Sequence, residues 1–350
     1  MKLLHLADLH LGAEMNARLT PDKAERRKQE LCEAFERAID YAKSIGVSAV
    51  LLAGDVFDTA YPQKWVKERF FEVVRSSPQI SFYYLRGNHD DARESNVLPN
   101  LFTFTDGWTT YSLGEGVTVS GIELTDGNSL TYYDGLRLNE RDKNIVLLHG
   151  QVADGKGKEK IHLRSLENKH IDYLALGHIH SYSTGRLGFR GCYAYAGCLE
   201  PRGFDEVGEK GFVVIDTDDF CPQFIVNEAR SVRLVTVDVS GTKGFSEVLA
   251  RASAAVTLEE KDMPRIQLVG EVDFQTNGLE DYVHRALEGK YLALSVKDET
   301  IPALHLEKYA DEVSLEAEFV RTVLADETLT EREKRRVIEK GLNALSGEKL

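Results

Sequence analysis

Polar side chains of the types that bind metal ions follow several apolar stretches of this sequence. The clearest case is "LGHIH", where His178 and His180 come directly after the apolar run 173–176. Because side chains alternate along an extended strand, both imidazoles point to the same side and lie about 6 to 7 Å apart. At that spacing both can reach one shared metal site.

Four other apolar runs end in the same way. The side chains that follow them are Asp8 and His10, then Asp55 within "GDVFD", then Asn88 within "GNHD", and then His149. Strand ends at one edge of an α/β sheet converge on a crevice, so residues far apart in sequence meet there. Each cluster alone is more often turn chemistry or a surface imidazole, but the whole set indicates a metal centre.

The donor set predicts two ions rather than one. It comprises Asp8, His10, Asp55, Asn88, His149, His178 and His180. A single catalytic ion usually keeps three or four protein ligands and an open position. Mixed carboxylate, amide and imidazole donors suit manganese, iron or zinc better than calcium. Two ions about 3.5 to 4 Å apart need a bridging ligand, and only a carboxylate can bridge, so Asp8 or Asp55 is expected there.

The elements that must position these donors are predicted by hydrophobic pattern. Strand-like runs occupy residues 2–7, 49–53, 80–85, 145–148, 173–176 and 192–196. Apolar residues recur at helical spacing over 22–45 and 63–75, between the first three runs. Alternating strands and helices of this kind predict a layered α/β core.

The pattern changes after residue 230. Strands are predicted at 233–240, 265–273 and 291–297, and helices at 245–256 and 278–287, which together make a small α+β module. Two charged helical pieces follow at 315–325 and 329–345, where Thr330 and Glu333 fit a capping box. We therefore predict three parts: 1–230, 231–300 and 301–350.

The last helix carries an apolar stripe formed by Val337, Ile338, Leu342 and Leu345. Such a stripe can pack on its own domain or bind a partner, and the sequence favours neither.

Composition limits the choice of partners and compartment. A net charge of −14 argues against binding nucleic acid through a bulk positive field. Bound divalent ions would neutralise part of that charge, and a basic partner or a local basic groove could supply the rest. No apolar run approaches 18 residues and the start is too briefly apolar for a signal peptide, so we expect a cytoplasmic protein without a membrane partner.

The order of the motifs resembles the calcineurin-like metallophosphoesterase superfamily. Its blocks Asp-x-His, Gly-Asp-x-x-Asp, Gly-Asn-His-Asp, His and Gly-His-x-His are all present. Within it, "HLADLHLG" and the stretch "YAYAGCLEPRGFDEVGEKGF" at 193–212 look like the SbcD-type (Mre-like) DNA-repair nucleases, although Cys198 stands where Ser is usual. The resemblance implies a layered β-sandwich flanked by helices, a small α+β capping domain and a helical C-terminal tail.

The resemblance also implies a role for each donor. One ion would be held by Asp8, His10, Asp55 and His180, and the other by Asp55, Asn88, His149 and His178, with Asp55 as the bridge. His89 would not be a ligand. It would bind the scissile phosphate and protonate the leaving oxygen, a role that suits a side chain with an ordinary pKa near 6.5.

The implied activity is a metal-dependent DNA exonuclease or endonuclease that cleaves phosphodiester bonds near ends or hairpins. Two Mn²⁺ ions, or Fe²⁺, Zn²⁺ or Mg²⁺, would lower the pKa of a bridging water and so provide hydroxide for in-line attack at phosphorus. The implied partners are DNA, an SbcC-like coiled-coil ATPase bound by the helix at 330–345, and a second copy of the chain. A small-molecule or protein phosphodiesterase or phosphatase is the alternative, and it fits the acidic charge better. A scaffold that only binds a partner fits the complete donor set least well.

Four further side chains are open to two interpretations. Asp90 could support a ligand from behind and Asp58 could brace the turn at Gly54, or each could be an ordinary cap or turn residue. Arg86 and Arg202 could contact phosphate, or form surface salt bridges.

Overall fold

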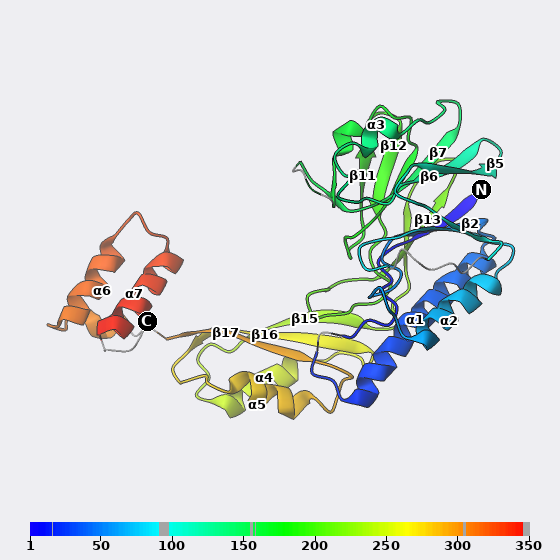
Figure 1. Ribbon diagram of the computed structural model, residues 1–350. Coiled ribbons are helices and arrows are strands. Elements are labelled where there is room, and N and C mark those ends of the chain that lie inside the picture. Colours follow the sequence, from blue (N-terminus) through cyan, green and yellow to red (C-terminus); the bar gives the residue numbers. More distant parts are fainter. Residues whose placement is uncertain (16, 91–97, 155–156, 158, 304–305, 346–350) are drawn as a thin grey trace. The chain divides into compact units, whose positions relative to one another are not determined.

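The computed structural model describes residues 1–350 except 16, 91–97, 155–156, 158, 304–305 and 346–350 (Figure 1). The chain divides into two compact units. Unit 1 comprises Met1–Leu234, Leu258–Arg265 and Leu287–Ser295, and unit 2 comprises Val235–Thr257, Ile266–Ala286 and Val296–Leu350. The three-part organisation predicted from the sequence, with boundaries after residues 230 and 300, stays a prediction. Residues 304–305 and 346–350 of its last part lie outside the described residues.

Unit 1 is built on two six-stranded sheets. The first has the order β14 (Gln223–Val226), β13 (Gly211–Asp216), β1 (Lys2–Leu6), β2 (Ala49–Ala53), β3 (Ser81–Leu85), β4 (Leu101–Thr103). The second has the order β11 (Ser183–Leu187), β12 (Gly191–Tyr195), β10 (Tyr173–Gly177), β7 (Lys143–His149), β6 (Val117–Gly121), β5 (Thr109–Gly114). A short parallel pair, β8 (Gln151–Val152) and β9 (Lys160–Ile161), follows β7.

The two sheets pack face to face around a shared apolar core. Leu3 and Leu51 of the first sheet belong to one buried cluster with Leu147 and Ala175 of the second. Because side chains alternate along a strand, the neighbouring residues, such as Val50, face the opposite way and join a separate cluster. The layered sandwich expected from the resemblance is confirmed.

Helices cover the outer faces. In Figure 1, α1 (Pro21–Ser44) and α2 (Lys64–Arg75) run side by side next to the first sheet. Phe35 of α1 and Phe70 of α2 stack with ring centroids 5.3 Å apart in the same cluster as Leu52 of β2. On the second sheet, Tyr132 of the short α3 (Tyr132–Gly135) shares a buried cluster with Leu174, and Leu163 of the 3₁₀ turn η1 (Leu163–Ser165) packs against the same cluster.

The direction of the central strands places the polar residues together. In the first sheet β1, β2 and β3 are parallel, and in the second β7, β10 and β12 are parallel. Their carboxyl ends therefore lie at one edge of each sheet, where the donors of the sequence motifs begin.

A three-stranded sheet follows, in the order β15 (Ser231–Asp238), β16 (Asp262–Val272), β17 (Ser295–Pro302), with helices α4 (Phe245–Ala255) and α5 (Leu279–Leu287). The predicted strand at 291–297 differs from β17 by several residues. Tyr291, Ala293 and Leu294 are buried but precede the strand. Ala293 packs in a small cluster with Met15 and Met263, so burial outside the sheet accounts for its apolar character.

The C-terminal part is helical: η2 (Leu306–Tyr309), α6 (Leu315–Ala325) and α7 (Glu331–Leu345). The predicted capping box is present, because the Thr330 amide donates to Glu333 at 2.8 Å and the Glu333 amide donates to the Thr330 hydroxyl at 3.3 Å. The apolar stripe divides: Ile338 is buried and Leu342 packs against the same cluster. Val337 and Leu345 are each 39% exposed. Among the helices of the described residues, none has the length and apolar character needed to span a membrane.

Candidate metal centre

Loops from both sheets are joined by hydrogen bonds at the centre of the site. Asp8 follows β1, and its amide donates to the Gly54 carbonyl after β2 at 3.0 Å. The Asp8 carboxylate is fully buried and accepts the His178 amide, after β10, at 2.9 and 3.0 Å. This single aspartate therefore connects three strand ends that are far apart in sequence.

The backbone is strained where the donors leave the strands. Asp8, His10, Asp55 and His178 all have positive φ angles, of 51°, 42°, 52° and 97°. Left-handed backbone is uncommon for residues other than glycine and costs on the order of 1–3 kcal/mol per residue. Strain of this kind clusters at functional sites, where it aims side chains that a regular strand would turn away.

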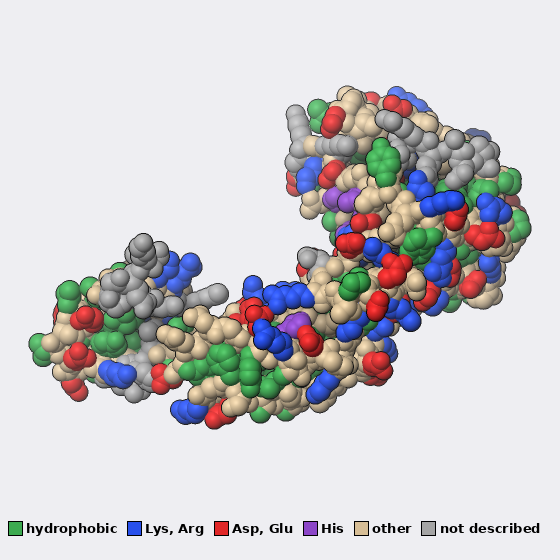
Figure 2. Space-filling model, turned by 60° about the horizontal axis from the view of Figure 1, so that its bottom comes forward, with side chains coloured by type: hydrophobic (Ala, Val, Ile, Leu, Met, Phe, Trp, Pro, Cys, Tyr) green, Lys and Arg blue, Asp and Glu red, His purple; other side chains and the backbone are tan. Residues whose placement is uncertain are grey.

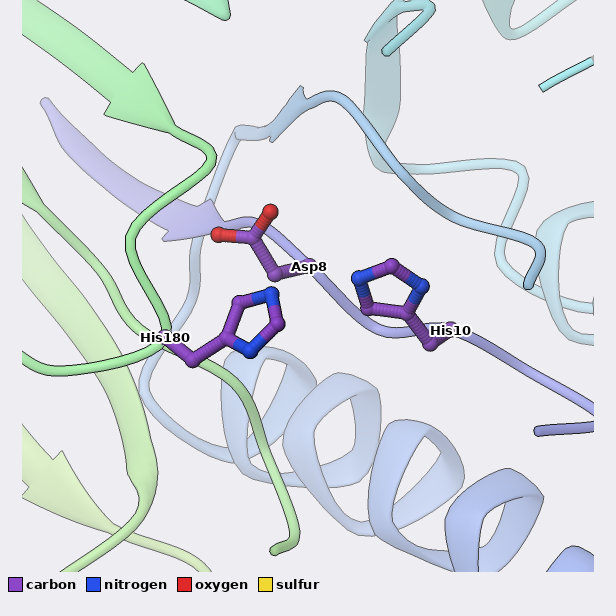
Figure 3. Close-up of side chains that lie close together, drawn as sticks. All are labelled: Asp8, His10 and His180. Atoms are coloured by element: carbon purple, nitrogen blue, oxygen red, sulfur yellow. The ribbon is translucent and has the colours of Figure 1, made fainter. Parts of the chain in front are cut away.

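Within the described part of the chain, three groups of Asp and His side chains each bring together one ligand atom per residue, all within 4.8 Å of one another. The first is Asp8, His10 and His180, whose side chains converge in Figure 3. The second is Asp8, Asp55 and His149, and the third is His10, Asp58 and His89. The structure thus brings Asp8, His10, Asp55, His149 and His180 together, and Asp8 belongs to both of the first two groups.

Buried ring nitrogens test whether these donors suit a metal ion. His149 donates from Nδ1 to the Ala53 carbonyl at 2.9 Å, so in the neutral ring, the form that binds a metal, Nε2 carries the lone pair. That Nε2 lies 3.2 Å from Asp55 without hydrogen-bond geometry, and both ring nitrogens of buried His10 also lack a hydrogen-bond partner among the described residues. Buried nitrogens are seldom left unpaired, so these residues fit a divalent cation.

The electrostatics of the second group favour a cation at the same place. Burial lowers the pKa of His149, but the carboxylates of Asp55 and Asp8 outweigh it and raise the pKa to about 9. Burial raises the pKa of Asp55, yet His149, the His89 amide and His10 hold it well below its usual range. A divalent ion would meet the same demand for positive charge between these carboxylates.

The remaining two predicted ligands, Asn88 and His178, both contact Glu159. Asn88 is exposed and donates from Nδ2 to Glu159 at 2.8 Å. The His178 ring lies 5.4 Å from that of His149, and its Nε2 is 3.9 Å from the same Glu159 carboxylate. Burial and the nearby His149 lower the pKa of His178.

His89 lies at the open side of the site. Its amide donates to Asp55 at 2.9 Å, its Nδ1 donates to the Asp58 carbonyl at 2.7 Å, and its exposed ring is 5.0 Å from that of His10. The third donor group thus places the predicted proton donor beside a predicted ligand.

The four residues of open interpretation have distinct contacts. The Asp58 carboxylate lies 3.3 Å from His10 Nδ1 and 3.1 Å from the guanidinium of Arg202. Asp90 accepts the amides of Phe57 and Gly87, each at 2.9 Å, and so holds the loops after β2 and β3 together. Arg86 forms a two-pronged ion pair with Glu123, with both distances 2.7 Å.

Two acidic residues at the site were missed from the sequence. Glu159 contacts Asn88 and His178, as described above. Glu206 accepts the His180 Nδ1 hydrogen at 2.6 Å and the Arg202 amide at 2.7 Å. Burial raises the pKa of Glu206, but these hydrogen bonds lower it more, to about 2. Glu206 lies within the stretch 193–212 that carries the resemblance, but no spacing in the sequence pairs it with His180.

The fold and the converging donors define a metal-dependent phosphoesterase. Residues 1–182, more than half of the chain, match the family described as Calcineurin-like phosphoesterase, and the chain belongs to that family of hydrolases. The site therefore implies a divalent metal.

Three relatives of this chain are named as a DNA repair protein or a nuclease component. The DNA double-strand break repair protein Mre11 of Thermoplasma acidophilum is 24% identical over an alignment of 358 positions, gaps included, which covers 94% of this chain and 91% of that protein. Mre11 of Sulfolobus acidocaldarius is 24% identical over 332 residues, 86% of this chain and 85% of that protein. The SbcD component of the nuclease SbcCD of Escherichia coli K12 is 23% identical over 268 residues, 62% of this chain and 65% of that protein.

Proposed function

We propose that this phosphoesterase is a DNA exonuclease or endonuclease that hydrolyses phosphodiester bonds near ends or hairpins. The observation that carries the proposal is the similarity to Mre11 of T. acidophilum, which extends over 94% of the chain and so includes segments beyond the phosphoesterase match. Both ring nitrogens of His10 and Nε2 of His149 are buried without a hydrogen-bond partner among the described residues, which supports the metal-dependent chemistry that such a reaction needs.

The proposed ligands are those implied by the motifs. Asp8, His10, Asp55 and His180 hold one ion, and Asp55, Asn88, His149 and His178 hold the other, with Mn²⁺ as the proposed metal. When bound, such ions activate a water for attack and stabilise charge on the phosphate oxygens. Because Nδ2 of Asn88 donates to Glu159, the amide oxygen Oδ1 is the atom of this side chain that would bind the metal ion.

The side chains around the donors have separate tasks in this proposal. Arg202 binds the phosphate of the substrate, because its guanidinium lies 3.1 Å from Asp58 and 3.1 Å from a ring nitrogen of His180, beside the proposed ligands. His89 protonates the leaving oxygen, since its ring is exposed and belongs to the third donor group, together with the predicted ligand His10. Asp90 keeps the loop that carries Asp55 in place. Arg86 is held by Glu123, so we assign it no phosphate contact.

Two interactions complete the proposal. The last helix docks on an SbcC-like coiled-coil ATPase, and two copies of the chain form a homodimer. The exposed Val337 and Leu345 on α7 support the first interaction, because they leave an apolar surface that α6 does not cover. The domain boundaries at 230 and 300 would then separate the hydrolytic, capping and partner-binding parts.

A phosphodiesterase or phosphatase for small molecules or proteins is the second candidate function. The net charge of −14 favours it, since DNA is itself strongly negative. On the face drawn in Figure 2, Lys and Arg side chains are interspersed with Asp and Glu, and neither sign forms a continuous field.

One experiment separates the two functions. Purified protein with Mn²⁺ is given labelled hairpin DNA, double-stranded DNA, or bis(p-nitrophenyl) phosphate, with and without the ATPase partner. We expect DNA cleavage that depends on Mn²⁺. Cleavage of the small ester alone, even with the partner present, would instead identify the second function.

Two variants test the assigned roles in the same assay. Asp55→Asn should lose metal binding and reduce activity by at least about 10³-fold, because it removes the proposed bridge. His89→Ala should keep both ions, measured by calorimetry, and lose about 10²- to 10⁴-fold in turnover. Asp40→Asn, on the exposed face of α1, is the matched control. Equal metal loss in the Asp55 and His89 variants would contradict the assignment.

A further inference from the structure

Glu206 contacts His180, a member of the first donor group. His180 and Glu206 come from different loops, after β10 and after β12, and their side chains are 26% and 11% exposed. Oε1 of Glu206 lies 2.6 Å from Nδ1 of His180. An ionised carboxylate has no hydrogen to give, so the hydrogen of this bond belongs to Nδ1.

The Glu206 carboxylate is itself held in place before it meets the imidazole. Its Oε2 accepts the Arg202 amide at 2.7 Å and lies 3.8 Å from the Cys198 thiol. The Glu206 amide donates to the Gly203 carbonyl at 3.2 Å, which closes a turn over residues 203–206. The carboxylate and the backbone are therefore fixed by residues of the same short loop.

This arrangement decides which nitrogen of His180 carries the lone pair. With the hydrogen on Nδ1, the lone pair of the neutral ring lies on Nε2. In Figure 3 the His180 ring lies beside Asp8 and His10, and these three side chains form the first donor group. The end of the long Arg202 side chain also lies near the ring, 3.1 and 3.3 Å from the two ring nitrogens, but a guanidinium cannot accept the Nδ1 hydrogen. Without Glu206 the ring could therefore turn or exchange its hydrogen.

We infer that Glu206 is a positioning residue that fixes the tautomer and orientation of His180 and thereby sets the affinity of the first donor group for its metal ion. The inference rests on the proposed metal centre but not on the choice of DNA as substrate. A partner behind a metal-binding histidine commonly changes metal affinity by about 10- to 100-fold.

The test measures metal binding directly, without substrate. Mn²⁺ is titrated into metal-free protein by calorimetry, and bound ions are counted by electron paramagnetic resonance. Glu206→Ala should lower the affinity for one of the two ions by about 10- to 100-fold and leave the affinity for the other within about threefold of the parental value. Glu206→Gln, which keeps an acceptor oxygen without its charge, should weaken the same ion by a smaller factor. Asp205→Asn, a neighbour in the same turn, is the control.

A second measurement reports on the tautomer itself. In metal-free protein labelled with ¹⁵N, the His180 ring should carry its hydrogen on Nδ1, and Glu206→Ala should shift it toward Nε2. Parental Mn²⁺ affinity and an unchanged tautomer in the Ala variant would overturn the inference. If the Ala variant fails to fold, the Mn²⁺ affinity of Glu206→Gln decides instead, because Gln keeps the acceptor and the tautomer but loses the charge, and parental affinity in that variant would overturn the inference. A parent protein that binds two ions yet cuts no DNA would overturn only the proposed nuclease.

Discussion

At the scale of single residues, the site depends on backbone that a regular strand cannot supply. The donor types and their order could be predicted from the sequence, because each follows an apolar run. The positive φ angles of Asp8, His10 and Asp55 could not, since aspartate and histidine have no obligatory backbone preference. Glu206 was missed for a related reason: its contact with His180 depends on how two loops meet in space.

Gly54 offers a direct test of this backbone geometry. It has a φ of 94°, and a Cβ there would overlap the ring of His149. Gly54→Ala should destabilise the protein by more than about 2 kcal/mol, through backbone strain plus the displaced imidazole, and weaken Mn²⁺ binding at least about tenfold. Gly114→Ala is the matched control, because Gly114 has a φ of 89° and no atom within 4 Å of the added Cβ. Urea unfolding and calorimetry measure both effects, and equal behaviour of the two variants would contradict the role given to Gly54.

At the scale of elements, the hydrophobic pattern predicts which residues are buried better than it predicts which residues pair in a strand. The central strands β2 and β10 match their predicted runs closely, because strands covered on both faces are continuously apolar. The edge strands β5 and β11 were not predicted, since most of their residues are half-buried or exposed and many are polar. The strand predicted at 291–297 was misplaced for the opposite reason: its apolar residues are buried without belonging to β17.

His5, in the interface between the sheets, should make stability depend on pH. His5 of β1 is fully buried and hydrogen-bonds the Tyr173 hydroxyl at 2.8 Å. Burial lowers its pKa from 6.5 to about 3, and a hydrogen bond with the Leu176 backbone offsets this only in part. Below pH 6.5 the unfolded chain takes up a proton at this residue and the folded protein does not, so stability falls as the pH falls toward 3.

The expected size of the effect is about 1.4 kcal/mol for each pH unit below about 6.5. Between about pH 6.5 and pH 5 the parent should therefore lose on the order of 2 kcal/mol more than His5→Leu, which cannot bind the proton. Urea unfolding in EDTA measures the two slopes without a contribution from bound metal. His170→Asn, at an exposed imidazole with a φ of 61° that asparagine tolerates, should keep the parental slope. Parallel slopes for the parent and His5→Leu would show that His5 is not the group responsible.

At the scale of the whole molecule, the distribution of chemistry along the chain separates hydrolysis from partner binding. All the proposed donors lie in unit 1, between Asp8 and His180, and the helices α6 and α7 lie in unit 2. The negative net charge makes binding to DNA through a bulk field unfavourable, so a nuclease of this composition needs another surface to hold its substrate. An ATPase partner would supply that surface, which gives the C-terminal helices their proposed purpose.

The helices α6 and α7 can be tested separately from the hydrolytic site. The buried Ile338 holds α7 against α6, whereas Val337 is 39% exposed and remains available to a partner. Deletion of residues 311–350 should abolish co-purification with the ATPase while cleavage of bis(p-nitrophenyl) phosphate stays within about twofold, because none of the donors is removed. Val337→Asp should weaken co-purification at least about tenfold without unfolding the helices, since burying a charge at an apolar contact is costly. Lys340→Ala, another exposed position on α7, serves as the control. Co-purification of the deleted protein at the parental level would show that the partner binds elsewhere, and an equal loss of ester cleavage would show that the helices support the hydrolytic fold instead.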